Sequence, residues 1–170
     1  KVMVKVEKPS AMDELADITS NSDGIMVARG DLGVETNPED VPIHQRTMVA
    51  ECRKQGKPCI VATQMLESMI DSPTPTRAEA SDVATAIFQG VDAVMLSAES
   101  AAGQYPQESV QMMDKIIKRV EADDKYKNNL TNYNLSHTKN TAEAIARAAF
   151  NVAEIIDSNC LVTFSKSGRS

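Results

Sequence analysis

Short apolar runs alternate with segments of helical periodicity over residues 1–123, and this alternation restricts the fold more than any other feature. The apolar runs that predict strands are residues 1–6, 24–28, 59–63 and 93–96. The periodic segments that predict helices are residues 11–20, 42–55, 76–90 and 107–123. Successive strand–helix units predict an α/β fold with parallel strands and right-handed crossovers. The pattern alone leaves two architectures, half of an eight-stranded barrel or an open doubly wound sheet.

Polar side chains follow each predicted strand at its carboxyl end, and this placement favours the barrel. The pairs are Lys5 and Glu7, Arg29 and Asp31, Thr63 and Gln64, and Ser97 and Glu99. Barrels of parallel strands and helices assemble their sites at this end. The expected fold is therefore the C-terminal half of a (β/α)₈ TIM barrel.

Two carboxylates and an ammonium are expected to meet at neighbouring strand ends. Lys5 and Glu7 are two residues apart on one strand, so their side chains share a face, and Asp31 follows the next strand. Glu7 and Asp31 are suited to hold one divalent metal ion, with Lys5 beside it to offset phosphate or enolate charge. Gly30 has no Cβ, which lets a substrate carboxylate approach the main-chain N–H groups of Gly30 and Asp31.

Five collinear segments resemble the signature of the pyruvate kinase family, closely up to about residue 122 and more loosely beyond. They are residues 5–9 (KVEKP), 22–35 (SDGIMVARGDLGVE), 57–68 (KPCIVATQMLES), 75–82 (PTRAEASD) and 94–99 (VMLSAE). This resemblance implies the last four βα units of the catalytic barrel. It also implies a phosphotransferase of glycolysis that moves the phosphoryl group of phosphoenolpyruvate to ADP, giving pyruvate and ATP.

The resemblance assigns roles to particular residues. Glu7 and Asp31 are expected to bind Mg²⁺ or Mn²⁺, and Lys5 to stabilise the phosphoryl group in transfer. Lys5, Gly30, Asp31 and Thr63 are expected to bind substrate, with Lys5 and Thr63 catalytic and Thr63 near the enolate face that is protonated. The family's K⁺ site is expected in sequence that precedes Lys1, and the full-length family forms homotetramers.

Two positions stay open. Arg29 either orients its turn or reaches a neighbouring subunit. Residues 97–100 read Ser-Ala-Glu-Ser, where many relatives have Ser-Gly-Glu-Thr, so a proton-relay role for Ser97 and Glu99 is unsettled.

The remaining residues are expected to begin a second domain. Residues 124–140 are polar and Asn-rich and read as a linker, and 141–170 read as the start of a C-terminal regulatory α/β domain, with a helix at 141–157 and a strand at 160–164. The last residues offer hydroxyls, N–H groups and two cations suited to a phosphate, and by resemblance they begin an allosteric sugar-phosphate site. These residues are Ser165, Lys166, Ser167, Gly168 and Arg169.

Composition excludes several other classes of protein. The net charge of −6 argues against nucleic acid and acidic membranes as partners. No apolar run approaches the roughly 20 residues that span a bilayer. The three cysteines lack metal-ligand spacing, and Cys59 and Cys160 lie in apolar runs where buried thiols are expected. These features indicate a reduced, cytoplasmic protein.

Two alternatives to an intact kinase remain. One is another metal-dependent barrel that handles phosphoenolpyruvate or pyruvate, such as an aldolase, from which ADP dependence would separate a kinase. The other is an inactive piece. The chain starts at Lys1 almost inside a strand and stops in a loop, which is typical of a fragment, and by resemblance the family's first four strands, small lid domain and most nucleotide contacts are expected outside these residues. We expect the 170 residues alone to show no kinase turnover and to expose sheet edges that promote association.

Overall fold

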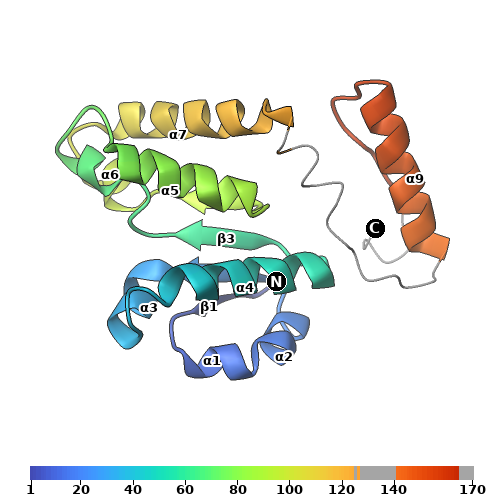
Figure 1. Ribbon diagram of the computed structural model, residues 1–170, viewed down its shortest axis with the longest axis horizontal. Helices are drawn as coiled ribbons and strands as arrows, with labels where there is room; N and C mark the ends of the chain where they lie inside the picture. The colour runs from blue at the N-terminus through green and yellow to red at the C-terminus, as the bar shows by residue number, and fades with distance from the viewer. Residues whose placement is uncertain (125, 127–140, 165–170) are drawn as a thin grey trace. The chain divides into compact units, whose positions relative to one another are not determined.

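A computed structural model describes residues 1–124, 126 and 141–164 of the chain. The chain divides into two compact units, Lys1–Tyr133 and Asn134–Ser170. Within the described part of the first unit, the strands are β1 (Met3–Val6), β2 (Gly24–Ala28), β3 (Cys59–Ala62) and β4 (Ala93–Met95). They form one parallel sheet in the order β1-β2-β3-β4, so each strand pairs with the next one in the sequence (Figure 1). The predicted parallel α/β architecture is confirmed.

Helices follow every strand. Those of the first unit are α1 (Ser10–Asp13), α2 (Leu15–Ser20), α3 (Arg29–Glu35), α4 (Val41–Gln55), the 3₁₀ helix η1 (Glu67–Ile70), α5 (Arg77–Phe88), α6 (Ala98–Ala101) and α7 (Pro106–Glu121). The described part of the second unit holds α9 (Thr141–Ile155). Figure 1 shows α5 and α7 side by side, and α4 lies against β2 and β3.

The register of the strands separates a core face of the sheet from a half-exposed face. Ile25 and Val27 of β2 are aligned with Cys59 and Val61 of β3, and all four are fully buried. They pack with residues of the crossover helices, among them Met48, Val49, Cys52, Val83 and Ala86. On the other face, Met26 and Ile60 are only partly buried, whereas Ala28 and Ala62 at the strand ends are fully buried. Core formation on one face thus leaves accessible the part of the other face that carries Lys5 beside Met26.

Local signals define the ends of two helices. Gly56 ends α4 at φ 63°, a left-handed conformation that a glycine adopts without a Cβ penalty, as the sequence predicts. Thr76 caps α5 in a capping box, because its side chain accepts from the Glu79 N–H while the Glu79 carboxylate accepts from the Thr76 N–H. The same carboxylate accepts from the Ser68 N–H at 2.7 Å and from the Ser68 hydroxyl at 2.5 Å. Glu79 therefore ties the start of α5 to η1.

The Glu79 contacts predict a pH-dependent contribution to stability. Burial raises the pKa of Glu79, but hydrogen bonds from Ser68 and Thr76 outweigh burial and hold this pKa below its ordinary value. The contribution is therefore present above about pH 4.3, the ordinary glutamate pKa, and is lost as the pH falls through the lower folded pKa. We expect Glu79→Gln to lower the free energy of unfolding by about 1–2 kcal/mol at pH 7.

Urea unfolding followed by circular dichroism at pH 7 and pH 3 measures this effect. The difference between wild type and Glu79→Gln should be smaller at pH 3 than at pH 7, because the stabilisation by the ionised carboxylate falls once the pH is below the ordinary glutamate pKa. Glu39→Gln, an exposed loop substitution, is the matched control and should follow the wild type at both pH values. An equal difference between Glu79→Gln and wild type at both pH values contradicts the prediction.

The structure differs from the sequence expectations in three elements. The predicted helix at 11–20 breaks at Glu14 into α1 and α2, and residues 29–35, for which the sequence predicts no helix, form the short helix α3. The strand expected at 160–164 is absent, and Cys160 is exposed rather than buried. A strand needs a partner for its backbone groups, and the described residues 141–164 contain none. The prediction of a buried thiol at Cys59 is correct.

Candidate active site

Lys5, Glu7 and Asp31 come together at the carboxyl ends of β1 and β2. The Lys5 ammonium lies 2.7 Å from Asp31 Oδ2 and also forms an ion pair with Glu7 Oε1. Lys5 and Glu7 share a face because they are two residues apart in extended chain, whereas Asp31 arrives from the first turn of α3. The structure thus assembles the charged cluster that the sequence indicates.

The electrostatics of the cluster keep its lysine protonated. The hydrogen bond to Asp31, and then the one to Glu7, raise the pKa of Lys5 above its ordinary value. All three side chains are between about a third and a half exposed, so they are open to a ligand in solution. An exposed, permanently charged ammonium between two carboxylates is suited to meet phosphate charge.

The two carboxylates fit a divalent cation. Glu7 and Asp31 converge on one positive group, the ammonium of Lys5, which shows that oxygens of both reach a common point. In the part of the chain that the structure describes, no three or more His, Cys, Asp or Glu side chains gather as a metal-binding group. The site would therefore supply two protein ligands. That number suits Mg²⁺, which keeps several waters and binds through one or two carboxylates.

Gly30 and Thr63 are in direct contact beside this cluster. The Gly30 N–H donates to Thr63 Oγ1 at 2.7 Å, and the Thr63 hydroxyl donates to the Ala62 carbonyl at 2.6 Å. A Cβ at position 30 would lie 3.3 Å from Thr63 Oγ1, which is tight for such a contact. The glycine therefore gives the threonine hydroxyl close access to the backbone. The sequence predicts that this N–H binds a substrate carboxylate, whereas in the structure it donates its hydrogen bond to the Thr63 hydroxyl.

The turn after β3 has an unusual backbone. Thr63 and Gln64 have φ values of 69° and 51°, in the left-handed region that β-branched residues rarely adopt. Arg29, which is only 8% exposed, bonds to this turn and to Asp82 of α5. Arg29 therefore bonds to the turn at residues 63–64 of its own chain, which neither of the two readings left open for it had named, and contact with a neighbouring subunit stays a prediction. Sequence reasoning found neither the left-handed turn nor the role of Asp82.

Glu99 links the segments that follow β3 and β4. Its carboxylate is 2% exposed and accepts from the Ser97 N–H at 2.7 Å and the Leu66 N–H at 3.2 Å. These bonds join Ser97, at the end of β4, to the chain just beyond Thr63. A structural role for Glu99 was missed in the sequence, although a carboxylate in the first turn of a helix was the available signal.

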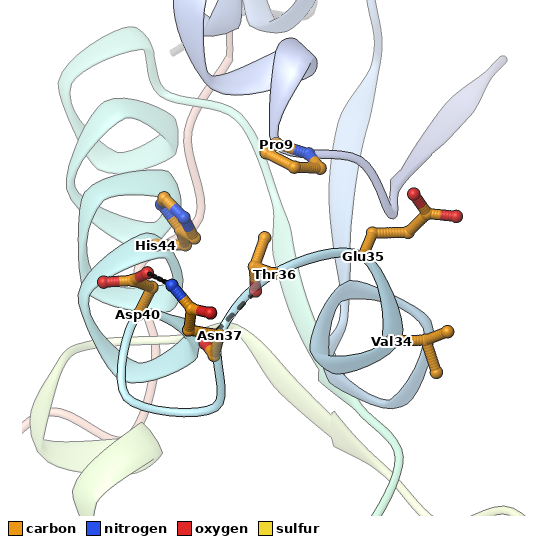
Figure 2. A pocket seen from close by; sticks show the side chains of 7 residues that line it. All are labelled: Pro9, Val34, Glu35, Thr36, Asn37, Asp40 and His44. Atoms are coloured by element: carbon orange, nitrogen blue, oxygen red, sulfur yellow. Dashed lines mark hydrogen bonds between the residues drawn. The ribbon is translucent and has the colours of Figure 1, made fainter.

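A separate pocket of about 440 Å³ opens beside α3. Figure 2 shows its lining, which comes from Pro9, from the end of α3 and the loop after it, and from the start of α4. Asn37 donates to Asp40 at 3.2 Å across the loop, and His44 faces the pocket from α4. None of the predicted site residues lines this pocket, so the charged cluster at the strand ends remains the candidate site.

The effector site and the membrane question are the remaining points of the sequence analysis. The phosphate loop at residues 165–169 and most of the linker fall outside the described residues. None of the helices in the described part of the chain combines the length and apolarity needed to cross a bilayer.

Comparisons with known proteins agree on one family. A family profile described as "Pyruvate kinase, barrel domain" matches residues 1–110. A pyruvate kinase of Agrobacterium vitis is 52% identical over 167 residues, which are 98% of this chain and 35% of that protein. A pyruvate kinase of Sporosarcina psychrophila is 46% identical over 170 residues, 100% of this chain and 29% of the relative. The crystal structure of a pyruvate kinase from Cryptosporidium parvum aligns with a TM-score of 0.82 and 40% identity, over 92% of this chain and 32% of that one. The chain thus spans about a third of the length of these relatives.

Proposed function

Because the chain belongs to the pyruvate kinase family, we propose that its charged strand ends are part of an active site that transfers the phosphoryl group of phosphoenolpyruvate to ADP. The observation that carries this proposal is the convergence of Glu7 and Asp31 on the ammonium of Lys5. Since the matched relatives are pyruvate kinases, the aldolase alternative is not favoured.

Each residue has a defined part in the proposed reaction. Glu7 and Asp31 would hold Mg²⁺ or Mn²⁺, and a divalent ion there supplies positive charge to the enolate and phosphoryl oxygens. Lys5 places a second positive charge beside them and offsets the negative charge of the phosphoryl group during transfer. A lysine ammonium carries this charge at neutral pH, and the neighbouring carboxylates raise the pKa of Lys5 further above its ordinary value.

Substrate binding and protonation belong to the neighbouring residues. The hydroxyl of Thr63 lies 2.7 Å from the Gly30 nitrogen and is fixed by its own bond to Ala62, so it can contact substrate in one orientation. By resemblance, the main-chain N–H groups of Gly30 and Asp31 bind the substrate carboxylate, and the Gly30 N–H would then exchange its bond to Thr63 Oγ1 for one to the substrate. Product formation ends with protonation of the enolate to pyruvate, on the face that Thr63 adjoins.

The proposal extends to the architecture and the setting of the whole protein. Residues 1–123 would form the last four βα units of an eight-stranded barrel, 124–140 a linker, and 141–170 the start of a regulatory domain. The half-exposed second face of the sheet supports the barrel, because a barrel interior covers that face. K⁺ dependence, a sugar-phosphate effector, a cytoplasmic location and a homotetramer are carried over from the family in the same way.

Binding of Mg²⁺ with oxalate, a mimic of enolpyruvate, tests the proposed site. We expect isothermal titration calorimetry to detect oxalate binding to this chain only with Mg²⁺, and Glu7→Gln to weaken it roughly tenfold or more because one of two protein ligands loses its charge. Glu39→Gln, an exposed glutamate outside the cluster, should bind as the wild type does. Equal binding by wild type and Glu7→Gln would falsify the metal assignment.

A further inference from the structure

The left-handed turn at Thr63 and Gln64 requires an explanation outside its own sequence. Neither residue is a glycine, and Thr63 is β-branched, so the conformation at φ 69° and 51° is intrinsically unfavourable. Such a conformation persists only where surrounding contacts enforce it. The contacts that reach this turn therefore decide where the Thr63 hydroxyl lies.

Arg29 supplies most of the side-chain contacts that hold this turn. Its Nη2 donates to the carbonyl oxygens of Thr63 at 2.7 Å and Gln64 at 2.9 Å, and its Nε lies 3.2 Å from the Thr63 carbonyl. Nη2 also contacts the sulfur of Met65 at 2.8 Å. A planar guanidinium presents these donors in a fixed fork, which an ammonium cannot do.

Asp82 holds the guanidinium from the opposite side. Its Oδ2 accepts from Arg29 Nη1 at 2.5 Å and provides the counter-charge for a cation that is only 8% exposed. Asp82 belongs to α5, 53 residues beyond Arg29 in the sequence. The helix thus fixes the arginine, and the arginine fixes the turn.

The enforced turn directs the Thr63 hydroxyl onto Gly30. In this position Oγ1 accepts from the Gly30 N–H at 2.7 Å, next to Asp31, which in turn contacts Lys5. A chain of contacts therefore runs from Asp82 through Arg29 and Thr63 to the charged cluster. Arg29 itself is buried and bonds to backbone, so it acts through Thr63.

We propose that Arg29, oriented by Asp82, is a positioning residue of the active site that holds the Thr63–Gln64 turn left-handed and so fixes the Thr63 hydroxyl against Gly30. The catalytic meaning of this position rests on the proposed kinase function. The geometric part concerns the turn alone and can be measured without any ligand.

Amide hydrogen exchange followed by NMR tests the geometric part in the ligand-free chain. The reporter is the Gly30 amide, and the internal reference is the Ile25 amide of the same strand–helix segment, which donates to the Pro58 carbonyl at 2.9 Å. We expect Arg29→Lys to speed exchange at Gly30 at least tenfold relative to Ile25. Asp82→Asn should act in the same direction more weakly, because a neutral amide still accepts one hydrogen bond. Arg46→Lys, an exposed arginine on α4, is the control and should leave the ratio unchanged.

A general loss of stability gives a different result from a loss of positioning. A general loss of stability would increase the exchange rates of the Gly30 and Ile25 amides together and leave their ratio constant. A constant ratio in both Arg29→Lys and Asp82→Asn overturns the proposal. Asp82→Asn preserves size and keeps the test available if Arg29→Lys does not fold.

Calorimetry with Mg²⁺ and oxalate tests the catalytic part. Weaker binding by Arg29→Lys, with Arg46→Lys unchanged, supports positioning of the site, whereas equal binding by wild type and Arg29→Lys overturns it. A different outcome is that the wild type fails to bind oxalate while Arg29→Lys still raises the exchange rate of Gly30 relative to Ile25. In that case the proposed function is wrong, and the conclusion that Arg29 holds the turn is retained.

Discussion

Replacing Leu32 with alanine is expected to lower the free energy of unfolding by about 2–5 kcal/mol. Leu32 lies on α3 and is fully buried in the cluster that also holds Val27 and Met48. The substitution removes apolar contacts and leaves a cavity, because the surrounding strands and helices relax only in part. The effect reaches the candidate site, since the same short helix carries Gly30 and Asp31.

Val34 is the matched control for Leu32. It lies on the same helix but is 84% exposed, so Val34→Ala should change stability by no more than about 0.5 kcal/mol. Urea unfolding followed by circular dichroism measures the free energy of unfolding of both variants. If the slope of this free energy against urea concentration equals that of the wild type, the unfolded states are comparable. Equal decreases in the free energy of unfolding of Leu32→Ala and Val34→Ala would mean that the buried side chain of Leu32 does not stabilise the fold more than an exposed one does.

Glu99→Gln is expected to cost about 2–3 kcal/mol of stability, the second large effect. The Glu99 carboxylate accepts from two backbone N–H groups, one on Ser97 and one on Leu66, while it is 2% exposed. Glutamine has nearly the same shape but only one acceptor oxygen, so its NH₂ group faces an N–H donor that loses its partner. A buried donor without a partner carries the full desolvation cost.

Glu67→Gln makes the same chemical change at an exposed position of η1 and serves as the comparison. We expect its urea midpoint to match that of the wild type. If Glu99→Gln also unfolds at the wild-type midpoint, the link between the chain after β3 and the chain after β4 does not contribute to stability.

Much of the fold and the charged cluster could be predicted from local pattern. The run Gly24–Ala28 is a strand with the expected bounds, because buried parallel strands read as continuous apolar residues. Lys5 and Glu7 meet because residues two apart in a strand share a face. Asp31 joins them because neighbouring parallel strands end at the same edge of the sheet.

The parts that could not be predicted depend on contacts between distant residues. Arg29 meets Thr63 and Asp82 across 34 and 53 residues, and no local periodicity encodes those pairs. The left-handed turn contradicts the preference of a β-branched threonine, so propensity predicts the wrong conformation there. The strand expected at residues 160–164 was wrong for a related reason, since an apolar run becomes a strand only beside a partner.

The order of the strands in the sheet also bears on how the chain acquires its structure. The strands β2, β3 and β4 each pair with the strand that precedes them in the sequence. When one of these strands is synthesised, its partner strand has therefore already been synthesised. Each closure spans a single crossover, which limits the loop entropy lost at any one step. Assembly can then proceed from β1 towards β4 as a series of short additions, and the Asp82–Arg29 bond can form only after α5 has been made.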